Sequence, residues 1–189
     1  ARTDEMGFMR KLTVWHYDTV ANCIAATGKG PVPTDWVDHN KGDDHNIYVR
    51  CRLVVQETKR RTLLDPTDIA ATFSATPPYE SLRMLCSFVM TPELPIDEDD
   101  VLMFIDISRA HPHCLMDRPF WIVLPPEDPR YGEEGICGKL DKSLYGVITA
   151  NRNFELKVAE DMTAMGFEQG TMSPCLYYHP GKRLKAYVH

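Results

Sequence analysis

The sequence has 189 residues, of which 43% are hydrophobic and 25% are charged, which is typical of a globular protein with one or two domains. No apolar run approaches the roughly 18 residues that a membrane span needs, and the polar first residues do not resemble a secretory signal. The net charge of −6 argues mildly against a nucleic-acid partner, although five basic side chains and one acidic side chain occupy residues 50–61. The chain does not begin with Met, so we expect a piece of a longer protein.

Residues 1–48 are the least informative part of the sequence, and their pattern predicts a short helix that ends near Gly28. Trp15, Val20, Cys23 and Ile24 share one face of this predicted helix. A Gly-Pro-Val-Pro break follows the helix.

Residues 48–56 predict a strand, because they are rich in β-branched side chains. Side chains alternate between the two faces of a strand, so Arg50 and Arg52 should share one face. The alternative is a solvated edge strand whose arginines bind nothing specific.

The middle of the chain predicts a helix and then a buried strand. Thr76 and the two prolines after it mark a helix start, and the apolar spacing continues this helix to about residue 90. After an acidic loop, residues 101–107 are apolar except for Asp106, which indicates a buried strand. A buried carboxylate needs a cation, a metal ion or a proton. The alternative is that Asp106 only starts a turn or caps the next helix.

The cysteines and histidines do not favour a disulfide framework or a zinc site. The six cysteines lie far apart and form no Cys-x-x-Cys pair, so we expect reduced thiols in an intracellular protein. His111, His113 and Cys114 lie close together, but no second ligand pair follows at zinc-finger spacing.

The last part of the chain predicts two strands, a helix and a hairpin. The strands cover residues 120–124 and 136–140, an apolar stripe runs from residue 154 to 165, and the hairpin joins residues 175–178 to 184–188. Gly166 should end the helix. Because strands and helices do not alternate regularly, the fold class should be α+β with a mostly antiparallel sheet.

In this order, the segments resemble the reverse transcriptase of copia-type LTR retrotransposons, from about Trp36 to Val188. Any one of these motifs is weak evidence for the family. Together they are specific evidence, because an Asp-bearing strand is followed, at the family's spacing, by Lys-Ser-Leu-Tyr-Gly and Pro-Cys-Leu-Tyr. The similar segments are Arg-Cys-Arg-Leu-Val at 50–54, Thr-Phe-Ser at 72–74, Ser-Leu-Arg at 81–83, Phe-Ile-Asp-Ile at 104–107, Cys-Gly-Lys-Leu-Asp-Lys-Ser-Leu-Tyr-Gly at 137–146, Met-Gly-Phe-Glu-Gln at 165–169 and Ser-Pro-Cys-Leu-Tyr at 173–177.

The resemblance implies an RNA-directed DNA polymerase segment of a Gag-Pol-type polyprotein. Residues 1–35 would be a lead-in, and residues 36–189 would form fingers strands and a polymerase-like palm with helices packed on its sheet. Its partners would be an RNA or DNA template-primer and a dNTP, with no membrane. Its location would be the cytoplasm, a virus-like particle or the nucleus.

The resemblance also implies the residues of the site. Two Mg²⁺ ions would serve the nucleotidyl transfer, with Asp106 as catalytic ligand and the Ile107 carbonyl as a further ligand. The implied nucleotide-binding residues are Arg50, Arg52, Arg109, Ala110, His111 and Thr149. The backbone N–H groups of Arg109 and Ala110 would hold the triphosphate, and Arg50 and Arg52 would neutralise its charge.

Three departures from the family pattern qualify this expectation. The Asp-Asp motif that the family carries after Tyr187-Val188 is not in the sequence, so we expect no polymerase activity from these 189 residues alone. His111 stands where the family has an aromatic residue that excludes the ribose 2′-hydroxyl. Thr149 stands where the family has a Gln, and Asn151 where it has a Pro. The alternatives are a catalytically inactive remnant that keeps the fold and binds nucleic acid, and an unrelated α+β domain.

Overall fold

The computed structural model describes residues 1–58, 72, 74, 77–90 and 102–188. It divides into two compact units, which are described separately. Unit 1 comprises Ala1–Phe73 and Arg109–Phe154, and unit 2 comprises Ser74–Ser108 and Glu155–His189. In the described part of the chain, no helix is long and apolar enough to cross a membrane.

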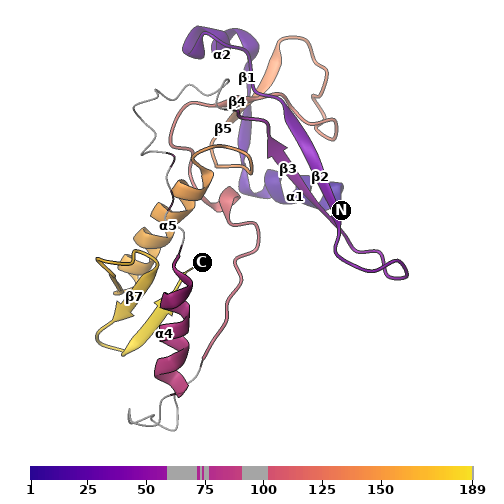
Figure 1. The fold of residues 1–189 in the computed structure, drawn as a ribbon. Helices are drawn as coiled ribbons and strands as arrows, with labels where there is room; N and C mark the ends of the chain where they lie inside the picture. Colours follow the sequence, from indigo (N-terminus) through magenta and orange to yellow (C-terminus); the bar gives the residue numbers. More distant parts are fainter. Residues whose placement is uncertain (59–71, 73, 75–76, 91–101, 189) are drawn as a thin grey trace. The chain divides into compact units, whose positions relative to one another are not determined.

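Unit 1 contains two antiparallel sheets, which Figure 1 shows with their strand labels. The first has the order β1-β5-β4, and the second is the hairpin β2-β3. Helix α1 packs against β3 and η2. The elements of this unit are α1 (Arg2–Leu12), β1 (Trp15–Thr19), α2 (Val20–Thr27), β2 (Thr34–Asn40), β3 (Val49–Val55), the 3₁₀ helix η2 (His111–His113), β4 (Trp121–Ile122), β5 (Ile136–Leu140) and the start of α5 (Ala150–Ala164).

The core of unit 1 combines residues that lie far apart in the sequence. Met9 and Val14 pack with Leu53 and Val55 of β3 and with Ile122 of β4. Further buried members are Phe120, Leu140, Leu144, Val147 and Ala150. The segment expected to be a lead-in therefore contributes a strand and core side chains to this unit.

Unit 2 contains helix α4 (Tyr79–Met90), the end of α5 and a three-stranded antiparallel sheet. The sheet has the order β6-β7-β8, with β6 at Glu168–Gln169, β7 at Leu176–His179 and β8 at Leu184–Tyr187. Helix α4 packs against β8. The predicted terminal hairpin is thus confirmed.

The predicted buried strand at residues 101–107 is wrong where the structure describes it. Residues 102–107 have no regular secondary structure, and Phe104 and Ile105 are each 80% exposed. An apolar run becomes a strand only when another backbone pairs with it and side chains cover it. Among the described strands, none pairs with this run.

Most of the other predicted elements are confirmed with shifted ends. Strand β3 and helix α4 lie where expected, although Thr76, the predicted start of the helix, is outside the described residues. Helix α2 ends at Gly28, whose φ is +67°, but Trp15 belongs to β1 instead of this helix. Strand β4 is shorter than predicted. The α+β class with antiparallel pairing is confirmed, and the palm architecture stays a prediction.

Candidate functional site

The face of the β2–β3 hairpin that carries Arg50 and Arg52 lies opposite the core. Arg50 pairs with His39 and Arg52 with Val37, so these four side chains share one face. The alternating residues of β3, Leu53 among them, are buried on the other face. The predicted alternation of β3 is therefore confirmed.

Tyr145 follows the buried Leu144 and lies against the end of this hairpin. The Val55 N–H donates a hydrogen bond to the Tyr145 carbonyl at 2.7 Å. The guanidinium of Arg52 lies 5.3 Å from the centre of the Tyr145 ring, a distance at which a cation and an aromatic face attract each other. Burial raises the pKa of the Tyr145 hydroxyl, while the charges of Arg52, Arg50 and Arg109 oppose this increase.

His111 reaches the same ring from the 3₁₀ helix η2. Its ring centre lies 4.8 Å from that of Tyr145, edge to face. Its Nε2 is 2.9 Å from Oδ1 of Asn151, and because that oxygen can only accept, Nε2 is the donor. Burial and the charge of Arg52 lower the pKa of His111, although the Asn151 hydrogen bond opposes them. Nδ1 of the neutral ring is therefore an acceptor.

The lowered pKa of His111 makes the stability of unit 1 depend on pH. Between the folded-state pKa and about 6.5, the unfolded chain binds more protons, so the free energy of unfolding should rise with pH. His111→Phe should reduce this rise, whereas replacing the exposed His45 by Phe should not. Urea unfolding at several pH values between 5 and 7.5 measures how the free energy of unfolding changes with pH. The same change with pH in His111→Phe as in the wild type would contradict the prediction.

Arg109 is held by α1 and turns the backbone sharply. Its Nε donates to Oε2 of the buried Glu5 at 2.5 Å, and its guanidinium lies 4.6 Å from the ring centre of Phe8. Arg109 has φ +54°, and Ala110 is right-handed. Successive residues of opposite handedness point their N–H groups into one concavity that suits an anion. In the described part of the chain, neither N–H has a hydrogen-bond acceptor.

We call Glu5, Arg52, Arg109, His111 and Tyr145 the Tyr145 cluster. All five belong to unit 1. The cluster combines a cation above an aromatic ring, a neutral imidazole and a buried carboxylate paired with a partly exposed guanidinium. Chemically, it can bind an anionic group that also carries hydrogen-bonding groups.

Thr149 lies in a buried network instead of the Tyr145 cluster. Its hydroxyl donates to Oδ1 of Asp117 at 2.9 Å and accepts from Nη1 of Arg118 at 2.7 Å. Nη2 of Arg118 lies 2.8 and 2.9 Å from the two carboxylate oxygens of Glu57. Because the side chain of Thr149 is only 1% exposed, its polar group is satisfied within the protein.

Asp106 and Ile107 belong to unit 2, and both are exposed. Asp106 is therefore not the buried carboxylate that the sequence predicted. Among the residues that the structure describes, no three His, Cys, Asp or Glu side chains come together as a metal site. The described surroundings of Asp106 therefore do not fit two Mg²⁺ ions by themselves, since Mg²⁺ takes several oxygen ligands.

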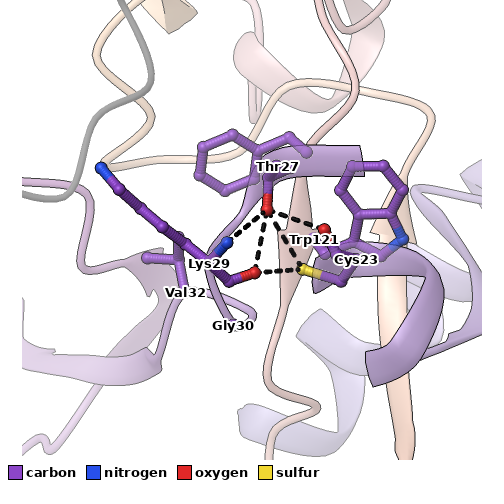
Figure 2. A pocket seen from close by; sticks show the side chains of 7 residues that line it. Cys23, Thr27, Lys29, Gly30, Val32 and Trp121 are labelled. Carbon is purple, nitrogen blue, oxygen red and sulfur yellow. Dashed lines mark hydrogen bonds between the residues drawn. The ribbon is translucent and has the colours of Figure 1, made fainter. Parts of the chain in front are cut away.

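A small pocket in unit 1 lies apart from these residues, between α2 and β4 (Figure 2). Its volume is about 20 Å³, room for one water molecule. The Thr27 hydroxyl lies 2.7 Å from the Cys23 carbonyl, and the Cys23 thiol donates to the Lys29 carbonyl at 3.3 Å. Burial raises the pKa of this thiol. These bonds close the turn after α2, and the pocket is too small for a nucleotide.

Sequence reasoning missed Glu5, the role of Tyr145 and the pair of Glu57 with Arg118. Tyr145 belongs to the Lys-Ser-Leu-Tyr-Gly motif, so the resemblance to the family could have pointed to it. Glu5 lies in α1, a helix that was not predicted, and 61 residues separate Glu57 from Arg118. Local patterns carry no signal for such distant pairs.

Comparisons with known proteins point to one family. The family described as "Reverse transcriptase (RNA-dependent DNA polymerase)" matches residues 16–186. The chain is also similar to the "Retrovirus-related Pol polyprotein from transposon TNT 1-94" of Nicotiana tabacum, with 26% identity over 153 residues. The match covers 80% of this chain but only 11% of that polyprotein. No solved structure matches.

Proposed function

The chain belongs to the reverse transcriptase (RNA-dependent DNA polymerase) family, and we propose that it supplies the nucleotide-binding part of an RNA-directed DNA polymerase. The observation that carries this proposal is the meeting of Arg52 and His111 on the Tyr145 ring, in the unit where Glu5 also holds Arg109. Arg52, Arg109 and His111 were expected from the sequence to bind the nucleotide. Arg50 lies on the same face of β3 as Arg52 and extends the positive charge.

The chemistry of this cluster suits a triphosphate. Guanidinium groups form charge-assisted hydrogen bonds with phosphate oxygens, which are about twice as strong as neutral ones. The N–H groups of Arg109 and Ala110 add donors without adding charge. Thr149 would not touch the nucleotide but would position the chain after Tyr145, through its hydrogen bonds with Arg118 and Asp117.

Asp106 and the carbonyl of Ile107 are proposed as ligands of the Mg²⁺ ions that the family implies. Bound Mg²⁺ supplies charge neutralisation and Lewis acidity in nucleotidyl transfer. The other ligands would come from outside the described residues.

The experiment is dNTP binding to the purified chain, with Arg52→Gln compared with Arg130→Gln. Arg130 is a matched control, because its guanidinium also lies over a tyrosine ring, 4.8 Å from the centre of Tyr17. We expect Arg52→Gln to weaken dNTP binding by about tenfold or more, because this is the effect of losing one hydrogen bond to a charged group. Arg130→Gln should stay within about twofold of the wild type, the scale of near-neutral surface changes.

Two results would contradict the proposal. One is equal dNTP affinity in the two variants, and the other is the absence of dNTP binding to the wild type. Asp106→Asn tests the metal assignment separately, since it should weaken the binding of Mg²⁺ itself to the purified chain.

The second candidate function is a non-catalytic nucleic-acid-binding remnant. The burial of Thr149, at a position where the family has Gln, favours it. In that case the chain would bind oligonucleotides with an affinity that falls steeply with salt, while Arg52→Gln would not change dNTP binding. Residues 59–61, which complete the basic segment, are outside the described residues.

A further inference from the structure

Arg109 has a backbone conformation that a side chain disfavours. Its φ of +54° lies in the left-handed region, where a residue with a Cβ is strained. Among the described residues other than glycine, only Thr13 and Arg183 share this region. Thr13 ends α1 and Arg183 lies in the turn between β7 and β8, which are usual places for it. Strain of this kind persists only where the surrounding structure imposes it.

Helix α1 holds the side chain of Arg109 at two points. Nε donates to Oε2 of Glu5 at 2.5 Å, and the guanidinium lies 4.6 Å from the ring centre of Phe8. The side chain of Glu5 is 4% exposed, whereas that of Arg109 is 35% exposed. A carboxylate buried to this degree needs its counter-charge. The burial of Glu5 therefore keeps Arg109 in place.

The helix that provides this anchor is itself well packed. Met6 and Met9 of α1 are each 1% exposed, and the helix packs against β3 and η2. Phe8 also meets the ring of His113 in η2, edge to face, with the ring centres 5.8 Å apart. Helix α1 therefore supports both Arg109 and the 3₁₀ helix that follows it.

The anchor fixes the direction of two backbone N–H groups. Because Arg109 is left-handed and Ala110 right-handed, their N–H groups point into one concavity of the kind that binds anions. If the φ of Arg109 relaxed to a negative value, the two groups would no longer converge. The guanidinium already has a carboxylate partner, so the Glu5–Arg109 pair adds little net charge to the site.

We propose that Glu5 is a positioning residue, which holds Arg109 in the left-handed conformation so that the N–H groups of Arg109 and Ala110 bind a phosphate group. The inference rests on the proposed function, because the nucleotide brings the phosphate. It makes α1 a part of the nucleotide site, although Glu5 precedes residues 16–186, which match the family. Arg109 then acts through its backbone and not through its guanidinium.

The first test measures dATP binding to two variants of the full 189-residue chain. Arg109→Gly and Arg109→Ala both remove the guanidinium, but only Gly adopts a positive φ readily. We expect Arg109→Gly to bind dATP about five- to tenfold more tightly than Arg109→Ala, because Ala disfavours the left-handed conformation. A pair that only stabilised unit 1 would not separate these variants in dATP affinity, because both lose it.

The second test asks whether Glu5 acts through Arg109. Glu5→Leu keeps a side chain of similar size and a good helix former, but it offers no acceptor. It should weaken dATP binding by about three- to tenfold, because the strained conformation loses its anchor. Added to Arg109→Gly, it should cause no further loss, because Gly needs no anchor.

Two matched controls lie outside the Tyr145 cluster. Arg183 is exposed and has the same φ, +54°, so Arg183→Ala introduces the same backbone change elsewhere. Glu133 is exposed and also accepts from an arginine Nε, that of Arg130 at 2.7 Å, so Glu133→Leu removes a similar pair. Both variants should bind dATP within about twofold of the wild type.

Equal dATP affinity of Arg109→Gly and Arg109→Ala would overturn the inference. So would a Glu5→Leu variant that binds dATP like the wild type, or one whose loss is the same in both backgrounds. In these cases the proposed function stands if Arg52→Gln still weakens dATP binding more than Arg130→Gln does. If the wild type does not bind dATP, both fail. The two Arg109 variants decide the inference even if Glu5→Leu does not fold.

Discussion

Arg118→Met should destabilise unit 1 by about 3–5 kcal/mol, the usual cost of leaving one partner of a buried ion pair alone. The side chain of Glu57 is only 1% exposed and that of Arg118 only 14%. Without the guanidinium, the Glu57 carboxylate would keep the Ile148 N–H, at 2.9 Å, but lose its counter-charge. Thr149 and Asp117 would lose a hydrogen bond from the same group.

Urea unfolding followed by tryptophan fluorescence measures this change, because Trp15, Trp36 and Trp121 all lie in unit 1. Arg130→Met is the control, since Arg130 forms an exposed pair with Glu133 that should contribute about 1 kcal/mol or less. The double variant Glu57→Leu/Arg118→Met should recover most of the loss, because apolar replacement of a buried pair is often neutral. An Arg118→Met loss no larger than that of Arg130→Met would contradict the role of the pair.

The elements that the sequence predicted correctly are those fixed by short-range patterns. Strand β3 has β-branched residues, α5 ends at Ala164 just before Gly166 with its φ of +91°, and the β7–β8 hairpin surrounds a Pro-Gly turn. Each of these signals lies within a few residues of the structure that it specifies. Such local preferences can be read without knowing the neighbours of the segment.

The elements that the sequence missed depend on distant partners. Strand β1 carries Trp15, His16, Tyr17 and Asp18, a mixed pattern, and it is a strand because it pairs with β5, more than 100 residues later. Residues 102–107 have the stronger strand pattern but no partner strand among the described ones. Strand formation is therefore a property of the pair, not of the segment.

The sequence predicted only part of the candidate site, because the rest depends on contacts between distant residues. Arg52 and His111 could be assigned from motifs, and they do meet around Tyr145. The unexpected member of the cluster is Glu5, which pairs with Arg109 and lies before the residues that match the family. A family pattern cannot reveal a contact with a residue that the pattern does not include.

Gly146→Ala should also be strongly destabilising, by about 3 kcal/mol, because strain and overpacking would act together. Gly146 has φ +84°, a conformation that costs other residues energy. A Cβ at this position would lie 2.0 Å from the carbonyl oxygen of Val55, where the close approach of two backbones leaves no room for it. The expected consequence is that the Tyr145 segment separates from β3 and that dNTP affinity falls with stability.

Gly132→Ala separates the two contributions to this loss. Gly132 has nearly the same φ, +81°, but an added Cβ would meet no atom within 4 Å. It should therefore cost only about 1 kcal/mol, the conformational part alone. The difference between the two variants in urea unfolding measures the close packing of Gly146 against β3. Equal losses would mean that this packing does not hold the Tyr145 cluster together, and the nucleotide-binding proposal would then lose its structural support.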